Sequence, residues 1–342
     1  MFIYILTFAV IGLSVFLYIS DMKTTLIFLS VFISVSLFGQ DVYIPDANFK
    51  AYLIGNSAIN TNSDTEIQLS EANVFDGEID CSALGISDLT GIEAFSELTV
   101  LSCWVNQLAS LDVSQNTALT QLSCGGNELT SLDVSQNTAL TQLYCEFNQL
   151  TSLDLSQNND LAFLDCENNQ LTSLDVSQNN DLFEFFCGNN QLASLDVSQN
   201  AFLGELFCEN NQLTSLDVSQ NTELWWLICE GNELNCLNAK NGNNTYIADF
   251  MVTDNPNLTC IEVDDAMYST ISWIDIDSQM YFSEDCNIDC SPSTVGITEL
   301  TTSKNLIQIL DLMGRETTFK PNTPLIYVYD DGSTEKVFSV EY

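Results

Sequence analysis

Apolar residues recur every 21 residues through the middle of the chain. In the unit at residues 129–149, Leu132 and Val134 flank one outward position, and Leu143 and Cys145 flank another. Alternation with a period of two is typical of β-strands that turn one face inward. The pattern therefore predicts two short strands in each unit. Because one unit cannot bury its own apolar face, the units are expected to stack as the coils of a solenoid.

Two asparagines of each unit follow the predicted strands, where the chain must turn. In the same unit they are Asn137 and Asn148. A buried asparagine side chain can hydrogen-bond to the backbone of a neighbouring coil, and stacked copies then form ladders. We therefore expect both asparagine columns to hold successive coils together.

Each unit also contributes one cysteine, at the second inward position of its strand. The ladder comprises Cys81, Cys103, Cys124, Cys145, Cys166, Cys187, Cys208 and Cys229. Neighbouring Cβ atoms at the strand spacing are farther apart than a disulfide prefers. We expect buried free thiols that act as small apolar residues, with a metal–thiolate ladder or scattered disulfides as alternatives. Four cysteines outside the ladder are expected to form disulfides whose connectivity stays open: Cys236, Cys260, Cys286 and Cys290.

The repeat also carries the signature of a known family. The half-unit Leu119-x-x-Leu122-x-Cys124-x-x-Asn127-x-Leu129 matches the leucine-rich-repeat pattern. Over residues 79–237 the chain resembles the internalin group of bacterial leucine-rich-repeat proteins, with 21-residue cysteine-bearing repeats of the internalin J type. The resemblance implies a mainly β fold, a solenoid of about eight coils with N- and C-terminal caps. It also implies that the strand face beside the cysteines binds a partner.

The outward positions of the cysteine-side strands vary from copy to copy. Large apolar side chains gather toward the later coils, with carboxylates beside them. Clustered exposed aromatics usually mark a contact surface, although drift at unconstrained positions is the alternative. We expect a protein ligand here, or a glycan as the second hypothesis, on Tyr144, Phe163, Phe186, Phe207, Trp226, Ile228, Glu184 and Glu205.

The other strand of each unit presents an invariant outward aspartate. The column comprises Asp112, Asp133, Asp154, Asp175, Asp196 and Asp217. Carboxylates stacked at roughly 4.8 Å repel one another. We expect Thr130, Ser131 and their copies to donate hydrogen bonds to the column. Bound cations are the alternative explanation.

A polar segment before the repeats has the ligand spacing of an EF-hand calcium loop. Its oxygen-bearing residues are Asn60, Asn62, Asp64, Glu66 and Glu71. The segment departs from that motif at Asn60, where Asp is usual, and at Thr65, where the sharp turn favours Gly. Calcium is thus the one cofactor that the sequence suggests. A polar turn without metal is the alternative.

The composition narrows the possible functions. The chain has 47 acidic and 7 basic residues and no histidine, and residues 51–239 contain neither Lys nor Arg. Nucleic-acid binding and attraction to anionic lipid are therefore not expected. The absence of histidine excludes Ser-His-Asp and Cys-His catalysis, which leaves a carboxylate-dependent hydrolase as a weak alternative to a binding protein. We expect the chain not to be an enzyme.

The sequences at the two ends of the chain indicate that the protein is exported. Residues 1–40 hold two apolar runs, and the second, from Met22, reads as a secretory signal, with a membrane anchor as the alternative. Residues 41–78 should form the N-terminal cap, with a helix at 45–53, and 79–238 the solenoid. Residues 239–290 should form the C-terminal cap, and 291–296 a linker.

The C-terminal segment, residues 297–342, predicts a small β-sandwich. The strand that ends at Met313-Gly314-Arg315 and the closing hairpin with Tyr327-Val328-Tyr329 resemble the type A C-terminal sorting domain of type IX secretion. That resemblance implies contact with the type IX machinery. It also implies a mature protein that is secreted or held at the outer cell surface, outside the membrane itself.

Overall fold

The computed structural model describes residues 39–287, 290, 306–311, 325–329 and 334–337. The chain divides into two compact units, Met1–Pro292 and Ser293–Tyr342. The two apolar N-terminal runs and the 291–296 linker lie outside the described residues. Among the described residues, no helix combines the length and apolar character that crossing a membrane requires.

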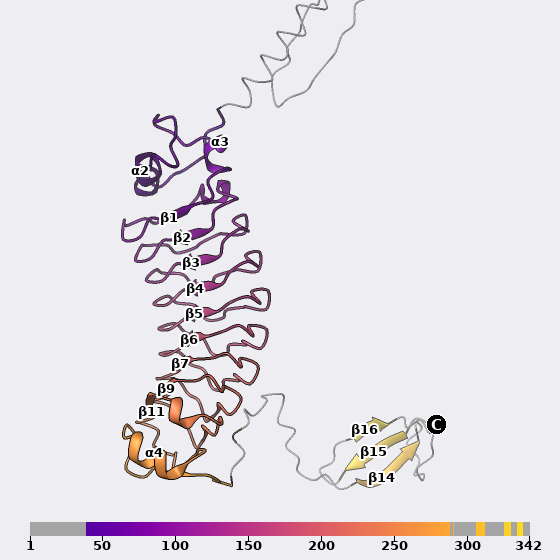
Figure 1. Ribbon diagram of the computed structural model, residues 1–342. Coiled ribbons are helices and arrows are strands. Elements are labelled where there is room, and N and C mark those ends of the chain that lie inside the picture. Colours follow the sequence, from indigo (N-terminus) through magenta and orange to yellow (C-terminus); the bar gives the residue numbers. More distant parts are fainter. Residues whose placement is uncertain (1–38, 288–289, 291–305, 312–324, 330–333, 338–342) are drawn as a thin grey trace, which may run out of the picture. The chain divides into compact units, whose positions relative to one another are not determined.

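The first unit is a solenoid of about ten turns, in which one parallel sheet runs along the cysteine side (Figure 1). We call this the cysteine-side sheet. Each of its nine strands has three residues, with the central one buried. They are β1 (Glu78–Asp80), β2 (Val100–Ser102), β3 (Gln121–Ser123), β4 (Gln142–Tyr144), β5 (Phe163–Asp165), β6 (Glu184–Phe186), β7 (Glu205–Phe207), β9 (Trp226–Ile228) and β11 (Asp249–Met251).

The coils continue beyond the last ladder cysteine, which the expectation of about eight coils did not foresee. Strand β11 pairs in parallel with β9, and Val252 takes the inward position that a cysteine holds in the earlier coils. A buried valine fills that position as a thiol does, because both are small and apolar. A further strand, β12 (Cys260–Glu262), forms within the segment that the sequence assigned to the C-terminal cap.

The second predicted strand of each unit forms only in the last coils. A sheet in the order β13–β12–β10–β8 contains β8 (Ser215–Asp217), β10 (Cys236–Asn238), β12 and β13 (Tyr281–Ser283). In earlier coils the equivalent segments are extended without a ladder, so the prediction of two strands per unit was wrong there. A cleft of about 230 Å³ lies between two such segments and is lined by Leu153, Leu155 and Leu174.

Two asparagine ladders join the coils, as the sequence predicted. Asn137 is fully buried, and its Nδ2 donates to the carbonyls of Val113 (3.0 Å) and Asn116 (2.9 Å) in the preceding coil. The Nδ2 of Asn148 donates to the Cys124 carbonyl (3.1 Å), and its Oδ1 accepts from the Leu129 amide (3.0 Å). Equivalent bonds repeat along the stack, so the interior carries hydrogen bonds as well as apolar contacts.

Helices and disulfides close the solenoid at its ends. Helix α2 (Ala47–Gly55) begins at Asp46, whose side chain accepts from the Asn48 and Phe49 amides, and it buries Phe49 and Leu53. Short helices α3 (Leu69–Ala72), α4 (Ala266–Ser272), η1 (Ile92–Ala94) and η2 (Asn244–Tyr246) complete the unit. Disulfides join Cys236 to Cys290 and Cys260 to Cys286, which decides the connectivity that the sequence left open.

The second unit contains one antiparallel sheet among its described residues. Its strands are β14 (Leu306–Asp311), β15 (Leu325–Tyr329) and β16 (Thr334–Val337), in that order. The strand and the hairpin lie where the sequence predicted them. The second layer of a sandwich falls outside the described residues and stays a prediction.

Candidate ligand-binding face

The cysteine ladder lies entirely inside the solenoid. All eight thiols are free and fully buried. Burial raises the pKa of Cys124 to about 12, so the thiol stays neutral at physiological pH. A neutral, inaccessible thiol is neither a nucleophile nor a metal ligand. The ladder therefore serves packing, and the chemistry of this face belongs to the residues that point outward.

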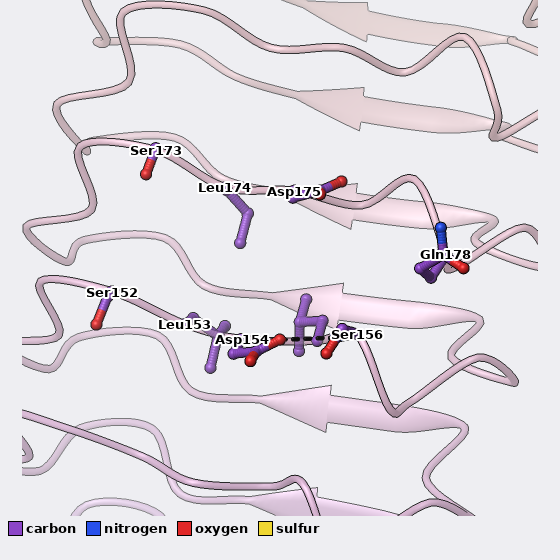
Figure 2. Close-up of a pocket in the computed structure, with 9 residues that line it drawn as sticks. Ser152, Leu153, Asp154, Ser156, Ser173, Leu174, Asp175 and Gln178 are labelled. Carbon is purple, nitrogen blue, oxygen red and sulfur yellow. Dashed lines mark hydrogen bonds between the residues drawn. The ribbon is translucent and has the colours of Figure 1, made fainter. Parts of the chain in front are cut away.

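The aspartate column is built into turns. Each aspartate accepts a hydrogen bond from the amide of the serine two residues later, for example Asp154 Oδ1 from Ser156 N at 3.0 Å (Figure 2). The donors expected at Thr130 and Ser131 are thus replaced by Ser135 and its copies, because the chain turns directly after the aspartate. These bonds lower the pKa of Asp133 and Asp154. The column is mainly architecture, although its aspartates also line the clefts between coils.

The aromatic side chains of the later coils form one cluster on the cysteine-side sheet. Phe186 and Phe207 are stacked with ring centroids 4.5 Å apart, and Phe207 meets Trp226 edge to face at 5.0 Å. Ile228 lies beside Phe207 in the next strand. All four side chains are half-buried, so their neighbours hold them while one side stays open to solvent. We call Phe186, Phe207, Trp226 and Ile228 the aromatic cluster.

Two residues of the predicted set lie apart from this cluster. In the column of Phe186, Asp165 stands between Tyr144 and Phe186. Phe163 lies between Gln142 and Glu184 in the neighbouring column. The strand register, which follows the 21-residue alignment of the outward positions, therefore separates these two rings from the cluster.

The structure adds two aromatic residues that the sequence analysis missed. Trp225 precedes Trp226, with ring centroids 5.6 Å apart, and Phe183 precedes β6. Both rings lie over Gly204, where a Cβ atom would be 2.7 Å from Phe183 and 3.1 Å from Trp225. Phe183 remains 39% exposed. Comparing the residue before each strand, as was done for the outward positions, would have revealed both.

Carboxylates border the cluster on both sides. Glu184 and Glu205 are adjacent in one column, and burial, followed by the charge of Glu184, raises the pKa of Glu205. On the other side the carboxylate of Glu209 lies in the space that a side chain at Gly188 would fill. It reaches Glu167, whose pKa is raised to about 8 by burial and then by Asp165 and Glu209. The face thus combines half-buried rings with carboxyl groups, and the pKa values of Glu205 and Glu167 are raised.

Gly125 occupies the position equivalent to Gly188 in a coil nearer the N-terminus, and a long side chain again fills the space beside it. The Glu146 carboxylate extends over Gly125 toward the preceding coil. Its Oε1 accepts from Trp104 Nε1 at 3.0 Å. Glycines at these outward positions therefore let long acidic side chains cross from one coil to another and reach partners two coils away.

The residues of the predicted calcium loop are already engaged with one another. Glu71 Oε1 accepts from the Thr61 amide (2.9 Å) and hydroxyl (2.8 Å), and Glu71 Oε2 accepts from the Gln68 amide at 3.1 Å. Glu66 pairs with Lys50 at 2.6 Å, and Asn60 Nδ2 donates to the Asp64 carbonyl at 2.9 Å. Calcium would have to displace these bonds, so its binding stays a prediction.

No group of three or more His, Cys, Asp or Glu side chains in the part of the chain that the structure describes is arranged to hold a metal ion. This holds for the carboxylates beside the aromatic cluster as well, which flank the rings instead of converging on one point. The face is therefore better suited to an extended ligand than to a single ion.

Comparison with known proteins identifies the architecture. The chain is similar to the functional domain of InlJ from Listeria monocytogenes, which includes a cysteine ladder, with 32% identity and a TM-score of 0.51. That match covers 69% of this chain and 60% of the other, so the chain spans less than two thirds of that relative's length. Internalin C2 from Listeria monocytogenes matches with 20% identity and a TM-score of 0.53, over 61% of this chain and 93% of the other.

The remaining comparisons gave no match. Scans of protein-family models and of curated protein sequences each found none. The structural neighbours are thus internalin-type leucine-rich-repeat proteins, and the fold of this chain is an internalin-like solenoid with a cysteine ladder.

Proposed function

We propose that the solenoid is the binding module of an exported protein and that it holds a protein partner on the outward face of its cysteine-side sheet. The aromatic cluster is the observation that carries this proposal. Stacked, half-exposed rings on a rigid surface offer a large apolar contact at small entropic cost. The internalin-like fold supports the same interpretation, since such solenoids present long surfaces for binding.

Binding is proposed here in place of catalysis. The invariant residues of each coil are occupied by turns, ladders and core, as Asp154 and Asn137 illustrate. The residues that differ between coils are the outward ones. A surface that varies over a constant scaffold is what partner recognition requires, because specificity can change without altering the fold.

The location follows from the two ends of the chain and is also a proposal. The apolar runs of residues 1–40 support export across an inner membrane, and the strand-and-hairpin pattern of 297–342 supports passage by type IX secretion. The expected product is a secreted or outer-surface protein. Deleting residues 297–342 in a bacterium with this machinery should retain the protein inside the cell, and unchanged export would reject the sorting role.

A capture experiment tests the binding face. The purified protein and the double variant Phe186→Ser/Phe207→Ser would be immobilised and exposed to extracts of host cells or of neighbouring microbes. A matched control, Gln136→Ser/Gln157→Ser, changes two exposed residues away from the sheet. Proteins captured by the wild type and by the control, but lost with the aromatic variant, would support the proposal.

Two other results would count against it. Equal capture by all three proteins would show that the aromatic cluster is not the contact surface. Retention of neutral oligosaccharides on a glycan array, again dependent on Phe186 and Phe207, would instead favour the glycan-binding alternative. Circular dichroism of each variant would confirm that the solenoid remains folded, since both substitutions lie on its surface.

A further inference from the structure

The stacked rings of Phe186 and Phe207 lie between two pairs of carboxylates. Glu184 and Glu205 are outward residues of the same two strands, two positions before the rings. On the opposite side, two positions after Phe207, Glu209 extends over Gly188 to Glu167. The arrangement is a flat aromatic platform with carboxyl groups along both edges.

These carboxylates have no basic partner within the solenoid. Residues 51–239 contain no Lys or Arg. The two lysines at the ends of this stretch are used elsewhere: Lys50 pairs with Glu66, and Lys240 Nζ donates to the Glu284 carbonyl at 2.7 Å. Half-buried carboxylates without a counter-charge are unfavourable, so a ligand that brings positive charge to this face gains free energy by relieving them.

Glu167 lies among other acidic side chains, which makes its ionised form unfavourable. Glu146, Asp165 and Glu209 all act on it, and burial with these charges raises its pKa to about 8. Asp165 itself has its pKa raised to about 6, mainly by burial. One Oε atom of Glu209 is buried without a hydrogen-bond partner among the described residues. A cationic group placed here would give this buried oxygen a hydrogen-bond partner.

We propose, building on the proposed function, that the partner presents a basic and apolar segment, with an arginine side chain lying over Phe186 and Phe207 and its guanidinium group between the flanking carboxylates. Arginine fits for two reasons. Its planar group stacks on aromatic rings, and its fork of N–H donors matches carboxylates that lie at the edges of a flat surface. A neutral sugar would fit the rings and leave the charge of the face uncompensated.

The charge distribution favours arginine over other cations as well. A divalent metal needs several oxygens that converge on one point, and among the described residues no group of three or more acidic side chains is arranged to hold one. A lysine ammonium group contacts one carboxylate as a point charge and cannot stack flat on a ring. Trp226 and Ile228 extend the platform into the next strand of the sheet and provide the apolar surface for the residues beside the arginine.

A peptide pair provides the test. The probe is a synthetic peptide in which arginines alternate with leucine and phenylalanine. In the control peptide every arginine is replaced by citrulline, which keeps the shape of the side chain and removes its charge. Binding to the purified full chain is measured by calorimetry. The arginine peptide should bind at least about tenfold more tightly than the citrulline peptide, because charge-assisted bidentate bonds are lost in the latter.

Protein variants locate the effect. Glu167→Gln/Glu209→Gln should weaken binding of the arginine peptide by about tenfold or more. The control Glu128→Gln/Glu233→Gln makes the same substitutions at two exposed residues away from the rings, removes at least as much charge, and should change binding by less than about twofold. Equal losses in the two variants would reduce the effect to net charge and overturn the proposal. Equal affinity for both peptides, or no binding of either, would also overturn it.

The outcomes separate this inference from the proposed function. Suppose that the Phe186→Ser/Phe207→Ser variant loses its captured partner while Glu167→Gln/Glu209→Gln keeps it and the arginine peptide does not bind. The face then binds protein by apolar contact, and the basic partner is rejected. If capture depends on neither pair of residues, the proposed function fails as well.

Discussion

Removing one asparagine from the interior ladder should destabilise the whole stack of coils. The Asn158 side chain is fully buried, and its Nδ2 donates to the carbonyls of Val134 (3.1 Å) and Asn137 (2.9 Å). Asn158→Ala deletes both bonds, each worth about 1 kcal/mol. Both carbonyls keep one backbone donor, from the Asn137 and Leu140 amides, so the full penalty for an unsatisfied carbonyl does not apply. We expect a loss of about 2–3 kcal/mol in the free energy of unfolding.

A second substitution at this position separates hydrogen bonding from volume. Asn158→Asp keeps the shape of the side chain but replaces the N–H donor by an oxygen that faces two carbonyl oxygens. At neutral pH it also places an unpaired charge in the core. It should cost more than Asn158→Ala, about 3–5 kcal/mol. Asn158 Oδ1 has no partner among the described residues, so only the donor side of the amide matters for this comparison.

Urea denaturation followed by circular dichroism measures both effects. Asn159→Ala is the matched control, because Asn159 is the next residue and its side chain is exposed. It should lie within about 0.5 kcal/mol of the wild type. If Asn158→Ala behaved like this control, or if Asn158→Asp were no worse than Asn158→Ala, the ladder would not hold the coils together as argued.

Three further predictions concern thiols, pH and calcium. The ladder thiols should resist iodoacetamide at pH 8 in the folded protein and react in urea, giving eight modifications by mass spectrometry, because burial raises the pKa of Cys124 to about 12 and blocks access; rapid labelling of the folded protein would contradict this. The folded state holds a proton on Glu167 (pKa about 8), whereas an ordinary glutamate in the unfolded chain has a pKa of about 4.5, so stability should fall as pH rises from about 5 to 8. Glu167→Gln should flatten that dependence in thermal melts, and an unchanged slope would show that this carboxyl is not responsible. Calorimetric titration with calcium should give heat with the wild type and none with Asp64→Ala; no heat with either would reject the calcium loop.

Much of the solenoid followed from the repeat itself. Spacing fixed which residues face inward, because a period of two along a three-residue strand leaves one central side chain to bury, as with Leu143 in β4. The repeated Asn137 and Asn148 predicted ladders for the same reason, since an identical residue in every coil meets its copy in the next. The thiols were expected to be free and buried, and they are.

The sequence predictions were wrong where the structure depends on the distance between neighbouring coils. Alternation of Leu153 and Leu155 predicted a strand, but a cleft separates that segment from its neighbour, and no ladder forms. The pattern along one chain cannot give the gap between two coils. Likewise, the loss of the cysteine after residue 229 suggested a cap, although Val252 continues the core.

The sequence by itself determined the solenoid, its inward residues and the variable outward columns, because repetition reports which positions every coil must share. Only the tertiary structure decided which outward residues meet. The aligned columns already placed Tyr144 beyond Asp165, but only the structure showed that the rings of Phe186, Phe207 and Trp226 are in contact. Gly188 and Gly204 then allowed Glu209, Phe183 and Trp225 to lean across coils. These side chains occupy space that a glycine in the adjacent coil leaves free. Their positions are therefore known only once the coils are stacked.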